Sequence, residues 1–349
     1  MKRTNIFFKG AALLLCLAML LPLAGCGESR ESQTAVFAMD TYMTLTAYGK
    51  NREAGLQAAE GVIRSMDAML DPELPTSTVY AMNHAGGESV VVPGQVARML
   101  STARTVYEQS GGALDLTIYP LVSLWGFVDG KYYVPKDEEI AGALGRLCFD
   151  QVVLSSFPAT GSHTVTMPPQ GQISFAAAAK GCAANYAIEA MRNAGVTSGI
   201  ISLGGNIQTL GLKPDGTRWR IGITDPFNPD TWLGTIDVGE TAVVTSGSYQ
   251  RYFTDAHGTT YHHLLRPKTG YPANNTLVSV TIICEDGTLA DCLSTAMFVL
   301  GESQALSYWR TYGGFDMILI TNDYRVVCTS GLIEEFKLSN SHYTLSYTE

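Results

Sequence analysis

The sequence predicts an α+β fold with largely antiparallel or mixed sheets flanked by helices. Runs with strand-like alternation and runs with helical periodicity follow one another without the strict βαβ order that a doubly wound parallel sheet requires. The dinucleotide-binding pattern GxGxxG is absent, because Gly204-Gly205 stands alone. Hydrophobic residues make up 46% of the chain and charged residues 16%. This composition is typical of a globular protein, built either as one large domain or as two closely packed lobes.

The N-terminal half begins with a predicted strand and continues mainly as helices. Apolar and polar residues alternate over 35–48, and apolar residues recur at helical spacing over 52–70. A loop that contains Pro and Ser follows at 71–78. Three further helices are expected, at 94–108, 136–147 and 178–194.

Short strands are more frequent in the C-terminal half. The alternation and the turn residues between the runs predict strands at 199–202, 206–212, 219–224, 235–238, 242–244 and 249–254. The remaining residues predict a strand at 277–284, helices at 289–300 and 303–312, and strands at 315–321 and 324–329. No internal repeat of fixed period is evident.

The first residues have the pattern of a bacterial secretion signal. Lys2, Arg3 and Lys9 precede an apolar run at 11–23, which is too short to span a bilayer comfortably. The run ends in Leu-Ala-Gly-Cys, which looks like a lipobox in which Cys26 becomes the lipidated first residue. The alternative is an ordinary cleaved signal followed by an incidental cysteine. We therefore expect a protein that is lipid-anchored to the cell membrane and faces outside the cytoplasm, with a signal peptide at 1–25, a flexible tether at 26–34 and a domain at 35–349.

The charge of the chain argues against nucleic acid as a partner. The formal net charge is −9, and removal of residues 1–25, which hold three basic and no acidic residues, makes it −12. Nucleic-acid binding depends on clustered Lys and Arg side chains that neutralise phosphates, and the sequence has no such cluster.

Five cysteines remain once the signal is removed and Cys26 is lipidated. They are odd in number, lack CxxC spacing and lie in apolar stretches, so we expect small buried residues and no structural zinc site. Whether Cys284 or Cys292 pairs with another cysteine stays open. The five are Cys148, Cys182, Cys284, Cys292 and Cys328.

Two oxygen-bearing side chains share one face of the helix expected at 289–300. Asp291 and Thr295 are four residues apart, and Ser294 lies beside them. Hard oxygen donors in this arrangement suit Mg²⁺, which takes one or two protein carboxylates and fills its other positions with water or phosphate. In the alternative interpretation, Asp291 and Ser294 only cap a solvated helix and Thr295 bonds to its own backbone. The spacing alone favours this alternative, because such pairs are common by chance.

Two further segments are candidates for ligand binding. The loop at 262–272 begins with two imidazoles and contains Pro and Gly, which restrict or free its backbone. The helix expected at 178–194 follows a run of alanines, so an anionic ligand could approach its N-terminal amides. A small-residue helix packed closely on a sheet explains the same run equally well.

Six segments taken together resemble the ApbE family, the flavin transferases that act on FAD. They keep the order that they have in the family and extend from about Met39 to Gly301. The segments are 112–127 (GALDLT and PLVSLWGF), 179–183 (AKGCA), 202–207 (SLGGNI), 245–253 (TSGSYQRYF), 262–272 (HHLLRPKTGYP) and 290–296 (ADCLSTA).

The resemblance implies an Mg²⁺-dependent reaction on FAD. FMN would be transferred to a Thr or Ser hydroxyl of an acceptor protein outside the cytoplasm, and AMP would be released. Such a phosphoryl transfer needs a metal that neutralises pyrophosphate charge and a group that orients the hydroxyl. The isoalloxazine and adenine rings need apolar or aromatic surfaces.

The resemblance also implies roles for individual residues. His263 matches the base or hydroxyl-positioning group, whereas His262 and His257 are expected at the surface. Asp291 and Thr295 match metal ligands, with Ser294 where some members have Asp, and Ala177 matches a ligand that could act only through its carbonyl. Contacts with FAD are expected from Met39, Leu124, Trp125, Gly126, Ser174, Lys180 and Leu265.

The chain departs from the family pattern near these residues. Ser174 and Arg266 stand where members have Asp, and Asp40 replaces a Gly. Three functions therefore stay open: transfer of FMN, hydrolysis of the FAD pyrophosphate, and binding of FAD without catalysis. The intact metal-ligand positions and His263 favour the transferase.

Overall fold

The computed structural model describes residues 30–157, 159 and 161–348. Its helices are α2 (Arg52–Leu70), α3 (Thr78–Asn83), α4 (Gly94–Gln109), α5 (Tyr119–Leu124), α6 (Asp137–Leu144), α7 (Ala179–Asn193), α8 (Gly287–Leu300) and α9 (Glu302–Tyr312). Short 3-10 turns lie at Leu116–Ile118, Phe149–Gln151 and Ser330–Leu332. The predicted signal peptide and Cys26 lie outside the described residues.

Most of the strands belong to one mixed sheet of nine strands. Its order is β1-β2-β6-β7-β10-β13-β14-β15-β17, and its neighbours are antiparallel except for the parallel pair β15 and β17. This arrangement confirms the predicted α+β class. The strands of this sheet are β1 (Glu31–Ala38), β2 (Thr41–Tyr48), β6 (Gly199–Leu203), β7 (Asn206–Leu210), β10 (Ala242–Gly247), β13 (Leu277–Cys284), β14 (Asp316–Thr321), β15 (Arg325–Thr329) and β17 (Thr344–Thr348).

Three smaller sheets complete the described chain. One contains β16, β9 and β8, a second contains β3, β5 and β4, and the third is the hairpin of β11 and β12. Their bounds are β3 (Val90–Val92), β4 (Val153–Phe157), β5 (Ser162–Thr166), β8 (Trp219–Asp225), β9 (Asn228–Val238), β11 (Tyr252–Thr254), β12 (Thr260–His262) and β16 (Phe336–Leu338).

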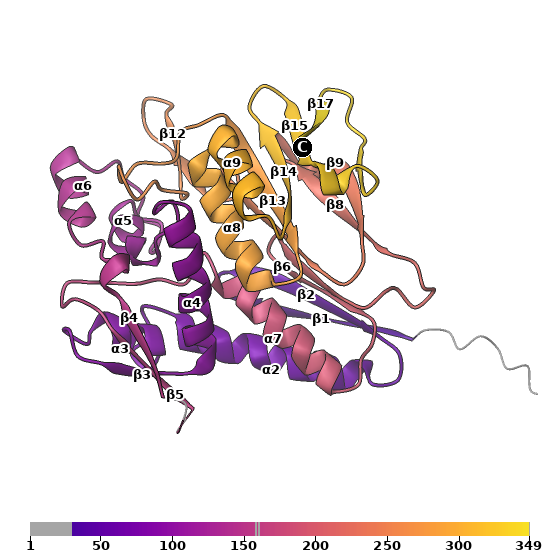
Figure 1. The fold of residues 1–349 in the computed structure, drawn as a ribbon, viewed down its shortest axis with the longest axis horizontal. Helices are drawn as coiled ribbons and strands as arrows, with labels where there is room; N and C mark the ends of the chain where they lie inside the picture. The colour runs from indigo at the N-terminus through magenta and orange to yellow at the C-terminus, as the bar shows by residue number, and fades with distance from the viewer. Residues whose placement is uncertain (1–29, 158, 160, 349) are drawn as a thin grey trace, which may run out of the picture.

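The nine-stranded sheet is covered on both faces, which gives the molecule three layers (Figure 1). Helices α2, α7 and α8 lie on one face, where α2 packs on α7, and α8 packs on β10 and β13. The sheet of β8 and β9 covers part of the other face through a core that includes Trp219 and Ile318. Residues on both faces of the central strands are therefore buried.

The predicted strand at 35–48 is wrong in one respect, because it is two strands. β1 and β2 form a hairpin in which Ala38 pairs with Thr41, so only Met39 and Asp40 make the turn. Both turn residues have positive φ, 48° and 57°. Such two-residue turns usually contain Gly or Asn, and Asp tolerates the left-handed region better than most residues do. Asp40, at the position where the family has Gly, thus fits the backbone.

Other differences concern the ends of elements. β1 begins at Glu31, so the last part of the predicted tether is a paired strand rather than a flexible segment. The strand expected at 249–254 is shortened to β11, because residues 249–251 form a turn. The strand expected at 235–238 is the end of the longer β9. The small sheet of β3, β4 and β5 was not predicted.

Two findings bear on the cysteines and on the membrane. The five cysteines after Cys26 are free and buried, which answers the question of pairing for Cys284 and Cys292. Within the described ranges, no helix is both long and apolar enough to cross a bilayer.

Candidate active site

Three turns meet at one end of the nine-stranded sheet. They are the Met39 turn, the turn of Gly204 and Gly205 between β6 and β7, and the turn that follows β10. A Cβ atom on Gly204 would lie 2.4 Å from Thr41 Oγ1, and one on Gly205 would lie 3.3 Å from Gln250 Nε2. Both glycines have positive φ, so larger residues would strain the backbone as well as separate the turns.

A cavity of about 240 Å³ lies beside these turns. Tyr249 and Gln250 line it together with the two glycines, and the strand residues Ile207, Ile221 and Ile223 add an apolar wall. A mainly apolar cavity with a few polar groups is typical of a small-molecule site.

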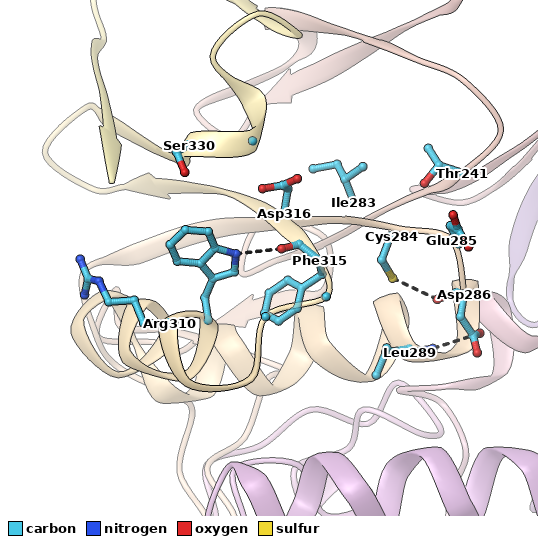
Figure 2. A pocket seen from close by; sticks show the side chains of 14 residues that line it. Thr241, Ile283, Cys284, Glu285, Asp286, Leu289, Arg310, Phe315, Asp316 and Ser330 are labelled. Atoms are coloured by element: carbon cyan, nitrogen blue, oxygen red, sulfur yellow. Dashed lines mark hydrogen bonds between the residues drawn. The ribbon is translucent and has the colours of Figure 1, made fainter. Parts of the chain in front are cut away.

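A larger cavity, of about 1080 Å³, lies at the other end of β13, around Cys284 (Figure 2). Ile283 and Phe315 line it together with the acidic residues Glu285 and Asp316. None of the predicted site residues borders either cavity. Cavity size alone therefore does not locate the chemistry.

The first turn of α7 is held by a carboxylate from α8. The N-cap residue Ala178 has no side chain that can accept a hydrogen bond, and Asp291 Oδ2 accepts one from the backbone N–H of Gly181 at 2.9 Å. Asp291 is buried, with 4% of its surface exposed. It does not cap its own helix, because Asp286 accepts hydrogen bonds from Thr288 and Leu289 at the start of α8. Asp291 thus joins the N-terminus of α7 to the second turn of α8.

This arrangement leaves two further oxygen atoms free. In a continuous helix the Gly181 amide would bond to the carbonyl of Ala177, four residues earlier. Because Asp291 accepts that bond, the Ala177 carbonyl has no hydrogen-bond donor in the described part of the chain. The Thr295 hydroxyl also has no hydrogen bond there, although Thr295 is partly exposed one helical turn beyond Asp291.

The donor set that results fits Mg²⁺. It consists of one carboxylate, one hydroxyl and one carbonyl, all hard oxygen ligands of the kind that Mg²⁺ takes together with water or phosphate. Among the described residues no group of three or more His, Cys, Asp and Glu could hold a metal ion. A metal held here would therefore depend on Asp291, Thr295 and Ala177 together with its substrate.

The two helices can approach closely only because glycines face each other. A Cβ atom on Gly181 would lie 1.9 Å from the Gly287 carbonyl oxygen and 2.8 Å from Asp291 Cβ. Any side chain at Gly181 would push α7 away from α8 and break the contact with Asp291. This close packing joins α7 to α8 at Gly181 and does not pack the alanine run on a sheet, and it is what places Asp291 at the first turn of α7.

Ser294 has a structural role in this arrangement. Its hydroxyl donates to the Asp291 carbonyl at 2.9 Å and lies 2.8 Å from the Ser246 hydroxyl of β10. It is fully buried. The proposed bonding of a hydroxyl to its own helix therefore applies to Ser294 and not to Thr295.

His263 is held with one ring nitrogen free. Its Nδ1 and its backbone nitrogen each lie 3.1 Å from the carbonyl oxygen of Arg251. A carbonyl only accepts, so we assign the hydrogen to Nδ1 and the lone pair to Nε2. Burial lowers the pKa of His263 to about 3, and the positive charges of Arg251 and Lys180 act in the same direction. The ring is therefore neutral, and Nε2 can accept a hydrogen bond from a hydroxyl.

The surface prediction for His262 is wrong, whereas His257 is exposed as predicted. The His262 ring packs edge-on against Phe298 of α8, with the ring centres 5.6 Å apart. Burial lowers its pKa to about 4, and its buried Nδ1 has no partner among the described residues. A buried nitrogen without a partner costs free energy, which a bound ligand or water could recover.

The segment predicted to contact flavin is largely a packing segment. Trp125 is fully buried, and its Nε1–H donates to the Gly270 carbonyl at 2.8 Å. A Cβ atom on Gly126 would lie 2.2 Å from the Lys131 carbonyl, so glycine is required there. Leu124 is partly exposed. Of these residues, only Leu124 has a side chain that reaches the surface, and Trp125 and Gly126 could contact a ligand only through backbone atoms.

The remaining predicted FAD-binding residues lie in three places: the turn between β1 and β2, the first turn of α7, and the His263 loop. Met39 is partly buried, and its backbone N–H donates to Asp67 Oδ1 at 2.8 Å. Lys180 is partly exposed in the first turn of α7. Leu265 is buried beside Trp125 and bridges to Pro272.

The two departures from the family pattern have different surroundings. The Ser174 hydroxyl accepts a hydrogen bond from the Ala176 N–H at 3.3 Å and so stabilises the turn before α7. The backbone of Arg266 closes the loop, because its carbonyl accepts from Thr269 and Gly270. The Arg266 side chain makes no ion pair among the described residues.

The sequence prediction missed Arg251 and Asp67. In the sequence, Arg251 is only one residue of an alternating run. Its contact with His263 forms across the hairpin of β11 and β12. Asp67 lies on α2, far in sequence from the turn that it fixes. Neither contact has a signal in local sequence patterns.

Comparison with known proteins identifies the family of this chain. Residues 39–319 match the model of a family described as the ApbE family. A protein of Treponema pallidum called FAD:protein FMN transferase is 31% identical over 361 residues, which cover 99% of each chain. A Klebsiella pneumoniae protein with the same name is 30% identical over 284 residues, 81% of this chain and 87% of the other.

Solved structures give the same result. The ApbE protein from Thermotoga maritima aligns with a TM-score of 0.77 and 28% identity, covering 84% of this chain and 94% of that one. The apo form of the flavinyl transferase ApbE from Pseudomonas stutzeri gives a TM-score of 0.73 and 27% identity, covering 84% and 92%. The chain therefore belongs to the ApbE family.

Proposed function

We propose that this chain is an FAD:protein FMN transferase that depends on Mg²⁺. The observation that carries the proposal is the set of oxygen donors at the N-terminus of α7, made by Asp291, Thr295 and the Ala177 carbonyl. Lys180 lies in the first turn of the same helix, and its charge lowers the pKa of the His263 ring, which supports a position of the neutral imidazole near the donor set. The names and extents of the relatives support the same activity.

In the reaction, the acceptor hydroxyl oxygen forms a bond to the phosphorus of the FMN half of FAD. The bond between that phosphorus and the bridging oxygen breaks, and AMP leaves with the bridging oxygen. His263 Nε2 orients the hydroxyl and receives its proton, and the nearby phosphate charges favour the protonated ring and raise its pKa from the value in the free protein. Asp291, Thr295 and the Ala177 carbonyl would hold Mg²⁺, which would supply positive charge that offsets the charge on the phosphate oxygens.

An assay of product release separates this activity from the alternatives. The protein is incubated with FAD and Mg²⁺, with and without a flavin-acceptor domain, and AMP and free FMN are measured by chromatography. A transferase releases AMP only when the acceptor is present and leaves no equivalent free FMN. AMP with equal free FMN in the absence of acceptor identifies a pyrophosphatase, and FAD binding without AMP identifies a binding protein. Either of these results contradicts the proposal.

We also propose that the mature protein is held at the membrane by lipid on Cys26, outside the cytoplasm. The lipobox pattern at 23–26 supports this location. We expect Cys26→Ser to move the protein from the membrane fraction to the soluble fraction, because a lipid anchor adds about 0.8 kcal/mol per buried methylene group. Fractionation of cells followed by immunoblotting measures the shift. Retention of the Ser variant in the membrane would argue for another anchor.

A further inference from the structure

Arg251 connects two parts of the active site. Its carbonyl oxygen accepts both hydrogen bonds that hold His263. Its Nη2 atom donates to the Phe127 carbonyl at 2.6 Å, at the end of the segment predicted to contact flavin. The Phe127 ring in turn lies against the His263 ring, with centres 6.3 Å apart. Arg251 therefore contacts the candidate flavin segment through its guanidinium and the candidate base through its backbone carbonyl.

The charge of Arg251 is not neutralised by the protein. No carboxylate forms an ion pair with it among the described residues, and its guanidinium makes only the bond to Phe127 there. The other guanidinium N–H groups remain available. Several other arginines of this acidic protein are paired, for example Arg220 with Asp237 and Arg325 with Glu302. An unpaired arginine that is fixed at one N–H is well suited to bind an anion with the others.

The surroundings of His263 favour a phosphate as that anion. The positive charges of Arg251 and Lys180 both act on its ring and lower its pKa. Lys180 lies in the first turn of α7, whose amides also attract negative charge. The protein as a whole carries a net charge of −9, so this local excess of positive charge is not a general property of its surface.

We propose that Arg251 is a substrate-binding residue whose guanidinium contacts the pyrophosphate of FAD beside His263. This inference rests on the proposed function, because it assumes that FAD is the substrate of this site. The contact to Phe127 holds the guanidinium in place before FAD binds, so little side-chain entropy is lost on binding. Its free N–H groups stabilise the charge on the departing AMP phosphate.

The test compares ligands that contain different parts of FAD. Binding of FAD, ADP and riboflavin is measured by titration in the presence of Mg²⁺ for wild type, Arg251→Gln, Arg251→Lys and the control Lys268→Gln. ADP contains a pyrophosphate without flavin, and riboflavin contains flavin without phosphate. Lys268 is exposed in the same loop as His263, so its substitution removes an equal charge nearby without touching the proposed contact. Thermal melting of each variant shows whether it is folded.

We expect Arg251→Gln to weaken the binding of FAD and ADP by about 10- to 100-fold, the range for a charge-assisted hydrogen bond. The affinity for riboflavin should change less than about twofold. Arg251→Lys should retain most of the ADP affinity because it keeps the charge, and Lys268→Gln should change none of the three. An equal loss of affinity for riboflavin and for FAD would overturn the inference, because Arg251 would then only position the Phe127 segment. Unchanged affinities for FAD and ADP, together with a raised KM for the acceptor, would also overturn it. The guanidinium would then bind the acceptor.

The experiment distinguishes a failure of this inference from a failure of the proposed function. If wild type binds FAD and ADP but transfers no FMN, the transferase proposal fails, while the comparison of ligands still decides the role of Arg251. If Arg251→Gln does not fold, Arg251→Lys alone tests the role of Arg251. A parallel loss of affinity for riboflavin and for ADP in that variant would contradict a phosphate contact.

Discussion

Asp291→Asn is expected to reduce FMN transfer by more than about 100-fold, because it removes the single carboxylate of the oxygen donor set. The Asn side chain can still accept the hydrogen bond from the Gly181 N–H, so the start of α7 should stay in place. Asp291→Ala removes that bond as well, and we expect it to cost about 1 kcal/mol of stability in addition, as loss of a helix cap does. Asp291 is buried, so its side chain contributes to the fold as well as to the proposed metal site.

Titration of activity with Mg²⁺ after treatment with EDTA measures the effect on metal dependence. Ser294→Ala is the matched control, because it lies on the same helix and loses only its bonds to Ser246 and to the Asp291 carbonyl. Wild type should lose activity in EDTA and regain it with Mg²⁺, and the control should behave in the same way. Transfer that survives both EDTA and Asp291→Asn would show that the metal assignment is wrong.

His263→Ala is expected to lower the rate of transfer by about 10²–10⁴, the usual contribution of a general base, and to leave FAD affinity within a few-fold. His257→Ala, which changes an exposed histidine, should have wild-type activity. Because burial lowers the pKa of His263 to about 3, the free protein should show no loss of kcat/KM near pH 6.5 that is due to this residue. Rate and affinity are measured separately by single-turnover transfer and by FAD titration. Equal losses of rate and affinity would make His263 a binding residue.

The sequence predicted the elements with strong periodicity and missed those that depend on distant contacts. The helix at 52–70 and the strand at 277–284 have the predicted bounds, because each carries a clear apolar pattern. The turn at Met39 was missed because it contains neither Gly nor Asn, the residues by which such turns are recognised. The strand β9 was predicted too short, since its first half is exposed and lacks an apolar pattern.

The same distinction holds for the site. The spacing of Asp291 and Thr295 predicted that the two side chains share one face of α8. The spacing could not predict the contact that Asp291 makes with α7. The bond from Gly181 to Asp291 spans 110 residues, and it frees the Ala177 carbonyl only because two glycines let α7 and α8 touch. His262 was expected at the surface, whereas in the fold its ring packs edge-on against Phe298. Such contacts are set by packing and have no local signal.

The central claim is that this site transfers FMN to a protein hydroxyl. The most direct test is the intact mass of a flavin-acceptor domain after incubation with the protein, FAD and Mg²⁺, with the same mixture containing EDTA as control. The account predicts that the acceptor gains the mass of one FMN less one water, at a Thr or Ser, and that the gain is absent with EDTA and with the Asp291→Asn protein. An acceptor of unchanged mass in the presence of folded, FAD-binding protein and Mg²⁺ would contradict it.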